Sequence, residues 1–185
     1  MDPRGPFLSE DDALNILESR KKYVDAVVIT GGEPLIHGDA PLFLKKLKDR
    51  GFSVKLDTNG FFPDLLEQCL NYADYIAVDV KTSPEKYYLL GAKDVSNLLR
   101  TIDLLKKCNV DYEFRNTVVP GIVEKEDIFK IGEIVKGAKR FVFQQFIPED
   151  TLDKRFKEVQ PYPPTTIKRF SEIMKKYVDE VVLRI

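Results

Sequence analysis

Short apolar runs alternate along the chain with longer segments in which apolar residues recur every three or four positions. The first pattern is typical of strands buried on both faces of a parallel sheet, and the second of amphipathic helices. The apolar runs predict strands at Ala26–Ile29, Ser53–Asp57, Tyr75–Val80, Asp111–Val118, Arg140–Phe146 and Val181–Leu183.

Helices are predicted between these strands and before the first of them. Ser9 is a suitable N-cap for the first helix, which we expect to end near Lys22, and Gly51 is a typical stop for the second. The other helical segments are Ala40–Arg50, Asp64–Leu70, a short turn from Ser83 to Gly91, Val95–Lys107, Lys125–Val135 and Thr165–Val178. The polar, proline-rich segment Glu149–Pro164 is interpreted as a long loop.

Strict alternation of strand and helix predicts an α/β fold of parallel strands, with residues 1–185 forming a single domain. Right-handed crossovers allow a doubly wound sheet or a barrel. A complete barrel of eight units typically needs about 250 residues, so a partial barrel or an open sheet remains. The chain begins with a helix where a strand would normally come first.

The end of the first strand carries the first candidate site. The run Ala26–Ile29 stops at Thr30 and continues as Gly31-Gly32-Glu33-Pro34. Paired glycines let the backbone approach a ligand closely, and carboxyl ends of parallel strands are where α/β folds bind ligands. A tight turn with a solvated glutamate is the alternative interpretation of the same residues.

Polar side chains also follow the next strands. Because carboxyl ends of parallel strands meet at one edge of the sheet, we expect all of them to converge there. Asp79 and Lys81 lie two positions apart and therefore face the same side. Buried charges of this kind require either a ligand or a salt-bridge network. The groups are Glu33; Asp57 and Thr58; Asp79 and Lys81; and Arg115, Asn116 and Thr117.

Composition narrows the chemistry. The 185 residues carry a net charge of −1, which gives no case for nucleic-acid binding, and no run is long enough to span a membrane. With no signal peptide and no disulfide pattern, we expect a cytoplasmic protein. His37 is interpreted as a solvated loop residue, and Cys69 and Cys108 as packing residues. The single histidine weakens the case for a metal-dependent hydrolase.

Four motifs together resemble the radical S-adenosylmethionine (SAM) superfamily, and most closely the glycyl-radical-enzyme activating enzymes. These include pyruvate formate-lyase activases and anaerobic ribonucleoside-triphosphate reductase activating proteins. The motifs occur in the family's order, and the likeness extends from about Ser9 to the C-terminus. They are Gly31–Pro34, Asp57–Gly60, Asp79–Lys81 and Arg115–Gly121.

The resemblance implies a partial (β/α)6 barrel that binds SAM and a [4Fe-4S] cluster. It implies that Gly31, Gly32 and Glu33 meet the SAM amino group, with Pro34 completing the motif. Lys81 and Arg115 would serve the SAM carboxylate and ribose. Further matching positions are Asp57, Thr58 and Asp79 beside a monovalent cation, Asn59 in the same motif, and Val118, Gln145 and Phe146 around the adenine.

The implied reaction is radical generation. One electron from the cluster would cleave SAM to methionine and a 5′-deoxyadenosyl radical, which would take a hydrogen atom from a glycine of a partner glycyl-radical enzyme. A closed site would protect such a radical from water. Other radical SAM families with different substrates share the barrel and its GGEP motif.

One departure from the family pattern stands out. The cluster ligands of the family are three cysteines spaced C-x3-C-x2-C after the first strand, and this sequence contains no such motif. We therefore expect a family member without its first strand and cluster loop, which as given binds no cluster and has no activity. A truncated chain, a misassigned start and a natural degenerate form are all compatible with this pattern.

Two further expectations follow. A non-catalytic α/β binding module that uses the same edge for a small zwitterionic ligand or a partner protein is the alternative function. Without a preceding strand, Ala26–Ile29 would be an exposed sheet edge, which invites pairing with a second copy of the chain.

Overall fold

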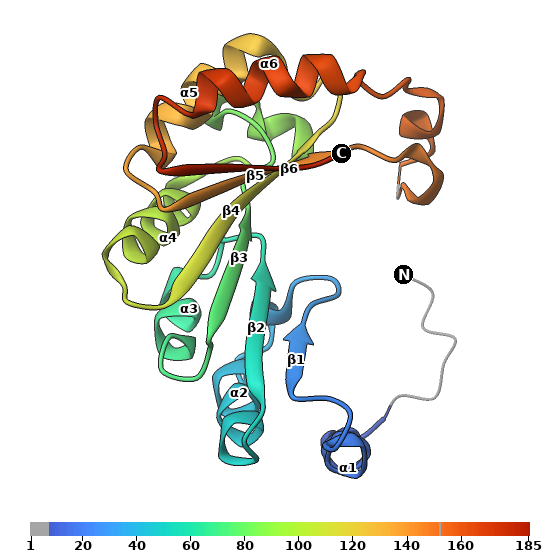
Figure 1. The fold of residues 1–185 in the computed structure, drawn as a ribbon, viewed down its shortest axis with the longest axis vertical. Helices are drawn as coiled ribbons and strands as arrows, with labels where there is room; N and C mark the ends of the chain where they lie inside the picture. Colours follow the sequence, from blue (N-terminus) through green and yellow to red (C-terminus); the bar gives the residue numbers. More distant parts are fainter. Residues whose placement is uncertain (1–7, 152) are drawn as a thin grey trace.

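The computed structural model describes residues 8–151 and 153–185 as one open sheet with helices (Figure 1). Its six strands follow one another in sequence order, and each pairs in parallel with the next. The α/β partial-barrel prediction is therefore confirmed. The strands are β1 Ala26–Ile29, β2 Ser53–Thr58, β3 Tyr75–Asp79, β4 Asp111–Val118, β5 Arg140–Gln145 and β6 Glu180–Arg184.

The helices lie along the outer side of the curved sheet and leave its inner side open, except for the first helix, which lies below the start of β1 (Figure 1). Their bounds agree with the sequence-based prediction to within a few residues, because caps and apolar spacing fix both ends. They are α1 Glu10–Arg20, α2 Ala40–Asp49, α3 Pro63–Cys69, α4 Ser96–Lys107, α5 Lys125–Val135 and α6 Pro164–Met174. The segment expected to be a plain loop after β5 contains two 3-10 turns, Pro148–Asp150 and Lys154–Glu158.

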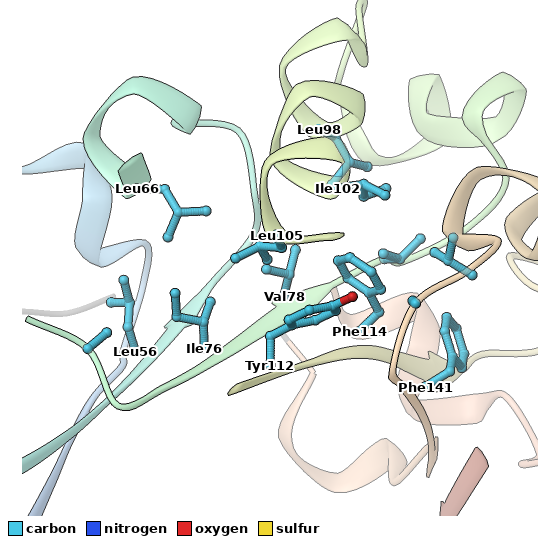
Figure 2. Close-up of a cluster of buried hydrophobic side chains, with 14 of the residues drawn as sticks. Leu56, Leu66, Ile76, Val78, Leu98, Ile102, Leu105, Tyr112, Phe114 and Phe141 are labelled. Atoms are coloured by element: carbon cyan, nitrogen blue, oxygen red, sulfur yellow. The ribbon is translucent and has the colours of Figure 1, made fainter. Parts of the chain in front are cut away.

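The hydrophobic core fills the space between the sheet and the helices. Leu56, Ile76 and Val78 of β2 and β3 are fully buried there, against Leu98 and Ile102 of α4 (Figure 2). Because side chains alternate along a strand, the neighbouring residues point to the inner side of the sheet. That alternation puts the charged residues of β2, β3 and β4 on the open face.

Both outer strands have a free edge among the described residues, since β1 pairs with β2 alone and β6 with β5 alone. Val28 of β1 is 50% exposed. An exposed edge of this kind is compatible with pairing to another chain. Dimerisation through Ala26–Ile29 stays a prediction.

The contact between α5 and the turn that follows α6 depends on a glycine. A Cβ on Gly132 would lie 2.4 Å from the Tyr177 ring, which is closer than any real contact. We expect Gly132→Ala to lower the free energy of unfolding by about 1–3 kcal/mol through overpacking. Urea denaturation measures the loss. Glu126→Ala, at an exposed position of the same helix, is the control, and a Gly132→Ala protein as stable as wild type would contradict this packing.

Candidate functional site

The site lies at the carboxyl ends of β2, β3 and β4, on the inner face of the sheet. The register places Asp79 of β3 directly beside Arg115 of β4, and Asp57 two residues before that level on β2. Three charged side chains that are far apart in the sequence therefore meet, as the strand pattern predicts.

Arg115 joins the two carboxylates. Its Nε and Nη2 lie 3.0 and 2.9 Å from Asp79 Oδ1, and its Nη1 donates to Asp57 Oδ2 at 3.1 Å. The Arg115 side chain is only 12% exposed. Burial disfavours its charge, but Asp79 and Asp57 outweigh that effect and raise the pKa of the guanidinium. Arg115 is therefore a fixed cation held between two anions.

Two lysines extend this row of charges. Lys81 Nζ lies 3.2 Å from Asp79 Oδ2, and Lys55 Nζ lies 3.1 Å from Asp57 Oδ1. The Lys55 contact lacks hydrogen-bond geometry, so Asp57 Oδ1 is buried without a hydrogen-bond partner among the described residues. The salt-bridge network considered from the sequence is present, and one of its carboxylate oxygens, Asp57 Oδ1, accepts no hydrogen bond within it.

A cavity of about 390 Å³ opens beside this row. Its charged side is formed by Asp79, Lys81 and Arg115, and most of the remaining wall is apolar. The volume falls within the range of roughly 300–1,000 Å³ that is usual for small-molecule sites. The other lining residues are Leu90, Thr117, Val119, Ile122, Phe146, Thr151, Asp153 and Phe156.

Glu33 lies outside that cavity and fastens the end of β1 to the end of β2. Its Oε1 accepts hydrogen bonds from Leu35 N at 3.1 Å and Thr58 Oγ1 at 2.7 Å, and its Oε2 accepts from Asn59 N at 2.6 Å. In this structure the carboxylate is therefore occupied by protein donors. Pro34 lines a separate hollow with Ile29 and the exposed His37.

The two glycines that precede Glu33 leave open space at the end of β1. Gly31 has φ +130°, where side chains other than glycine are strained, and nothing lies within 4 Å of the position of a Cβ on Gly31 or Gly32. A ligand could approach this backbone without meeting a side chain. Contact of these residues with a ligand stays a prediction.

Only some of the residues expected to bind a monovalent cation lie together. Asp57 and Asp79 share the inner face. Thr58 points to the other side of β2, and its hydroxyl donates a hydrogen bond to Glu33. Asn59 is likewise used locally, because its Oδ1 accepts from Phe61 N. Within the described part of the chain, no three His, Cys, Asp or Glu side chains are grouped as a metal site. A cation beside Asp57 and Asp79 stays a prediction.

The three residues expected around the adenine differ in position. Phe146 lines the cavity, whereas Val118 is buried among core residues on the helix side. Gln145 donates from Nε2 to the Tyr162 carbonyl at 3.2 Å. The residues beside Val118, Thr117 and Val119, line the cavity instead.

The sequence did not single out the cavity wall formed by Thr151, Asp153 and Phe156. These residues belong to the segment that was interpreted as a long loop. The Phe156 ring packs edge-on against Phe146 with centroids 6.5 Å apart. An apolar residue in an otherwise polar stretch is the one signal that could have marked this wall.

A buried carboxylate holds two of the loops around the cavity. Asp127 of α5 accepts hydrogen bonds from Ser83 Oγ at 2.7 Å, Lys86 Nζ at 2.6 Å and Glu124 N at 2.7 Å. Its side chain is 3% exposed. Burial alone would raise the pKa of Asp127, but these donors outweigh it and lower the pKa.

Acid should therefore destabilise the fold by protonating Asp127. Because the pKa of Asp127 is lower in the folded state than in the unfolded chain, its contribution is complete above about pH 4 and is lost as the pH falls through the folded value. We expect the urea midpoint of the wild type to fall more steeply below pH 4 than that of Asp127→Asn. Parallel curves for the two proteins would contradict this assignment.

The two cysteines lie away from the cavity. Cys69 ends α3 and Cys108 follows α4, so both are at the amino-terminal edge of the sheet. Cys69 is fully buried, and burial raises the pKa of its thiol to about 12. An inert, buried thiol is the expected packing residue rather than a ligand.

Comparisons with known proteins show the family of the chain. Residues 1–131 match the model of the radical SAM superfamily. A Methanocaldococcus jannaschii protein with the provisional name glycyl-radical enzyme activating enzyme is 38% identical over 88% of this chain and 71% of its own length. The pyruvate formate-lyase-activating enzyme of Clostridium pasteurianum is 25% identical over 80% of this chain and 65% of its own length.

Solved structures show the same fold. A domain of pyruvate-formate lyase-activating enzyme from Bacteroides vulgatus superimposes with a TM-score of 0.67 at 15% identity, over 84% of this chain and 98% of that domain. None of the helices in the described residues is long and apolar enough to cross a membrane.

Proposed function

Because the chain belongs to the radical SAM superfamily, we propose that residues 1–185 form one domain that is the SAM-binding core of a glycyl-radical-enzyme activating enzyme. The observation that carries this proposal is the cavity with Asp79, Lys81 and Arg115 on one side and a mostly apolar wall, which also includes Asp153, on the other. SAM combines a zwitterionic amino-acid end, a sulfonium and an apolar adenine. A site for it needs both signs of charge beside an apolar wall.

The proposed roles follow from the separation of charged and apolar residues in the cavity. Lys81 and Arg115 hold the SAM carboxylate and ribose, and Phe146 with Val119 and Ile122 contacts the adenine. The backbone of Gly31 and Gly32 approaches the SAM amino group, where no side chain intervenes. Asp57 Oδ1, which accepts no hydrogen bond although Lys55 Nζ lies 3.1 Å away, supports a monovalent cation beside Asp57 and Asp79.

The proposed partner is a glycyl-radical enzyme, as the names of the relatives suggest. The product of the complete reaction would be a glycyl radical on that partner. We propose a cytoplasmic location for this enzyme, because iron–sulfur clusters are sensitive to oxygen and the cytoplasm is reducing.

The cluster itself does not fit the residues of this chain. A [4Fe-4S] cluster needs several thiolates close together, and the sequence holds two cysteines, both at the edge of the sheet opposite the cavity. The proposal is that this polypeptide binds SAM and, by itself, does not cleave it.

Calorimetry with SAM tests the binding half of the proposal. We expect a one-to-one complex with a dissociation constant in the micromolar range, and absence of binding would contradict it. Incubation with iron, sulfide and a reductant tests the other half. We expect no cluster absorbance and no 5′-deoxyadenosine, and the appearance of either would show that the chain is competent after all.

A further inference from the structure

Three loops form the walls of the cavity. The loop after β3 contributes Lys81 and Leu90, the loop after β4 contributes Val119 and Ile122, and the segment after β5 contributes Phe156 and its neighbours. The shape of the cavity therefore depends on contacts that hold these loops together behind the lining residues.

The first two loops are joined by side chains that do not line the cavity. Asp127 binds Ser83 and Lys86 of the loop after β3, and Thr82 Oγ1 donates to the Ile122 carbonyl at 2.7 Å. Two walls are therefore fastened to each other and to the start of α5.

The third wall is tied to the second through Glu124 and Tyr162. Tyr162 Oη donates to Glu124 Oε2 at 2.7 Å, and the other oxygen of the same carboxylate accepts from Gly121 N at 3.0 Å. The Tyr162 ring also packs edge-on against Phe170 of α6, with centroids 5.8 Å apart. One carboxylate thus connects the turn before α5 to the far end of the segment that carries Phe156.

We propose that Glu124 and Tyr162 are positioning residues that hold the third wall against the cavity and thereby set how tightly it retains its ligand. The identity of that ligand, SAM, rests on the proposed function. Neither residue lines the cavity, so neither is a contact residue for SAM.

The third wall needs such a tether because of its composition. Between β5 and α6 it has only short 3-10 turns and no strand pairing among its described residues. Segments with few backbone hydrogen bonds open easily unless other contacts hold them. Burial and the neighbouring Glu124 raise the pKa of Tyr162 to about 12, so its hydroxyl remains a donor at neutral pH.

The test compares two tyrosine-to-phenylalanine variants. Tyr162→Phe removes the hydrogen bond to Glu124 and keeps the ring against Phe170. Tyr112→Phe is the matched control, because its hydroxyl accepts from Lys139 N at 3.3 Å at the opposite edge of the sheet. Hydrogen–deuterium exchange and calorimetry with SAM are measured on both proteins.

For Tyr162→Phe we expect amide exchange in residues 147–161 to accelerate about tenfold and the dissociation constant for SAM to rise about 5- to 10-fold, the loss of roughly one hydrogen bond to a charged group. Tyr112→Phe should change neither. Glu124→Leu should lose affinity for SAM to a similar extent. Glu124→Gln should keep most of that affinity, because its amide can accept a hydrogen bond from Gly121 N and donate one to the Tyr162 oxygen.

The exchange measurement and the calorimetry can each overturn the proposal. Unchanged exchange in Tyr162→Phe would show that the hydroxyl does not hold the wall. Faster exchange with unchanged SAM affinity would show that the wall does not set ligand retention. If the wild type fails to bind SAM, the proposed function and the ligand named here both fail, whereas the exchange result still decides whether Glu124 and Tyr162 hold the wall.

Discussion

Replacing Arg115 with leucine should abolish measurable SAM binding and lower the free energy of unfolding by about 3–5 kcal/mol. Leucine leaves Asp57 and Asp79 without the guanidinium that lies between them, and their remaining cationic partners, Lys55 and Lys81, are 30% and 50% exposed. Removing one partner from a buried ion network costs more than the network contributes, because the remaining charges stay desolvated. The proposed contact with the SAM carboxylate is lost in the same step.

Arg100→Leu is the matched control for Arg115→Leu. Arg100 also pairs with an aspartate, Asp64, but the two side chains are 57% and 76% exposed. Exposed pairs contribute about 0–1 kcal/mol, so this variant should stay close to wild type in both measurements. Urea denaturation and calorimetry distinguish the two variants. Equal, small effects at Arg100 and Arg115 would contradict a buried network at the centre of the site.

Removing the Glu33 carboxylate should have the second-largest effect. Glu33→Ala eliminates three hydrogen bonds: one within its own turn, from Leu35 N, and two that join the end of β1 to the end of β2, from Thr58 Oγ1 and Asn59 N. We expect a loss of about 2–4 kcal/mol in the free energy of unfolding, since hydrogen bonds to charged groups contribute about 1.5–3 kcal/mol each and water replaces part of them.

Glu33→Gln separates the charge from the shape of this side chain. Its amide group would bring a donor against either Asn59 N or the Leu35 and Thr58 donors, so roughly half of the loss should persist. Glu67→Ala, on the exposed side of α3, is the control. If Glu33→Gln is as stable as wild type, the three donors do not depend on a carboxylate and this account of the motif is wrong.

The elements of the fold could be predicted because their signals are local. β1, β4 and α5 have the predicted bounds, since apolar spacing, caps and glycines mark them within the segment itself. Parallel pairing then places Asp57, Asp79 and Arg115 at one edge without any knowledge of distances. This is the part of the site that sequence order alone determines.

The rest depends on long-range contacts that no local pattern encodes. Glu33 binds Thr58 and Asn59 of a different strand end, and Tyr162 reaches back to Glu124 across α5 and β5. The orientation of Thr58, in contrast, follows from the sequence, because alternation along β2 puts its side chain on the opposite face from Asp57.

The central claim is that the cavity beside Arg115 binds SAM. Methyl NMR spectra of the wild-type protein, recorded during titration with SAM, test it most directly. We predict that the methyl signals of Leu90, Val119 and Ile122 will shift with a common dissociation constant, while those of Leu66 and Ile76 in the core remain in place. Binding that leaves Leu90, Val119 and Ile122 unshifted would contradict the account.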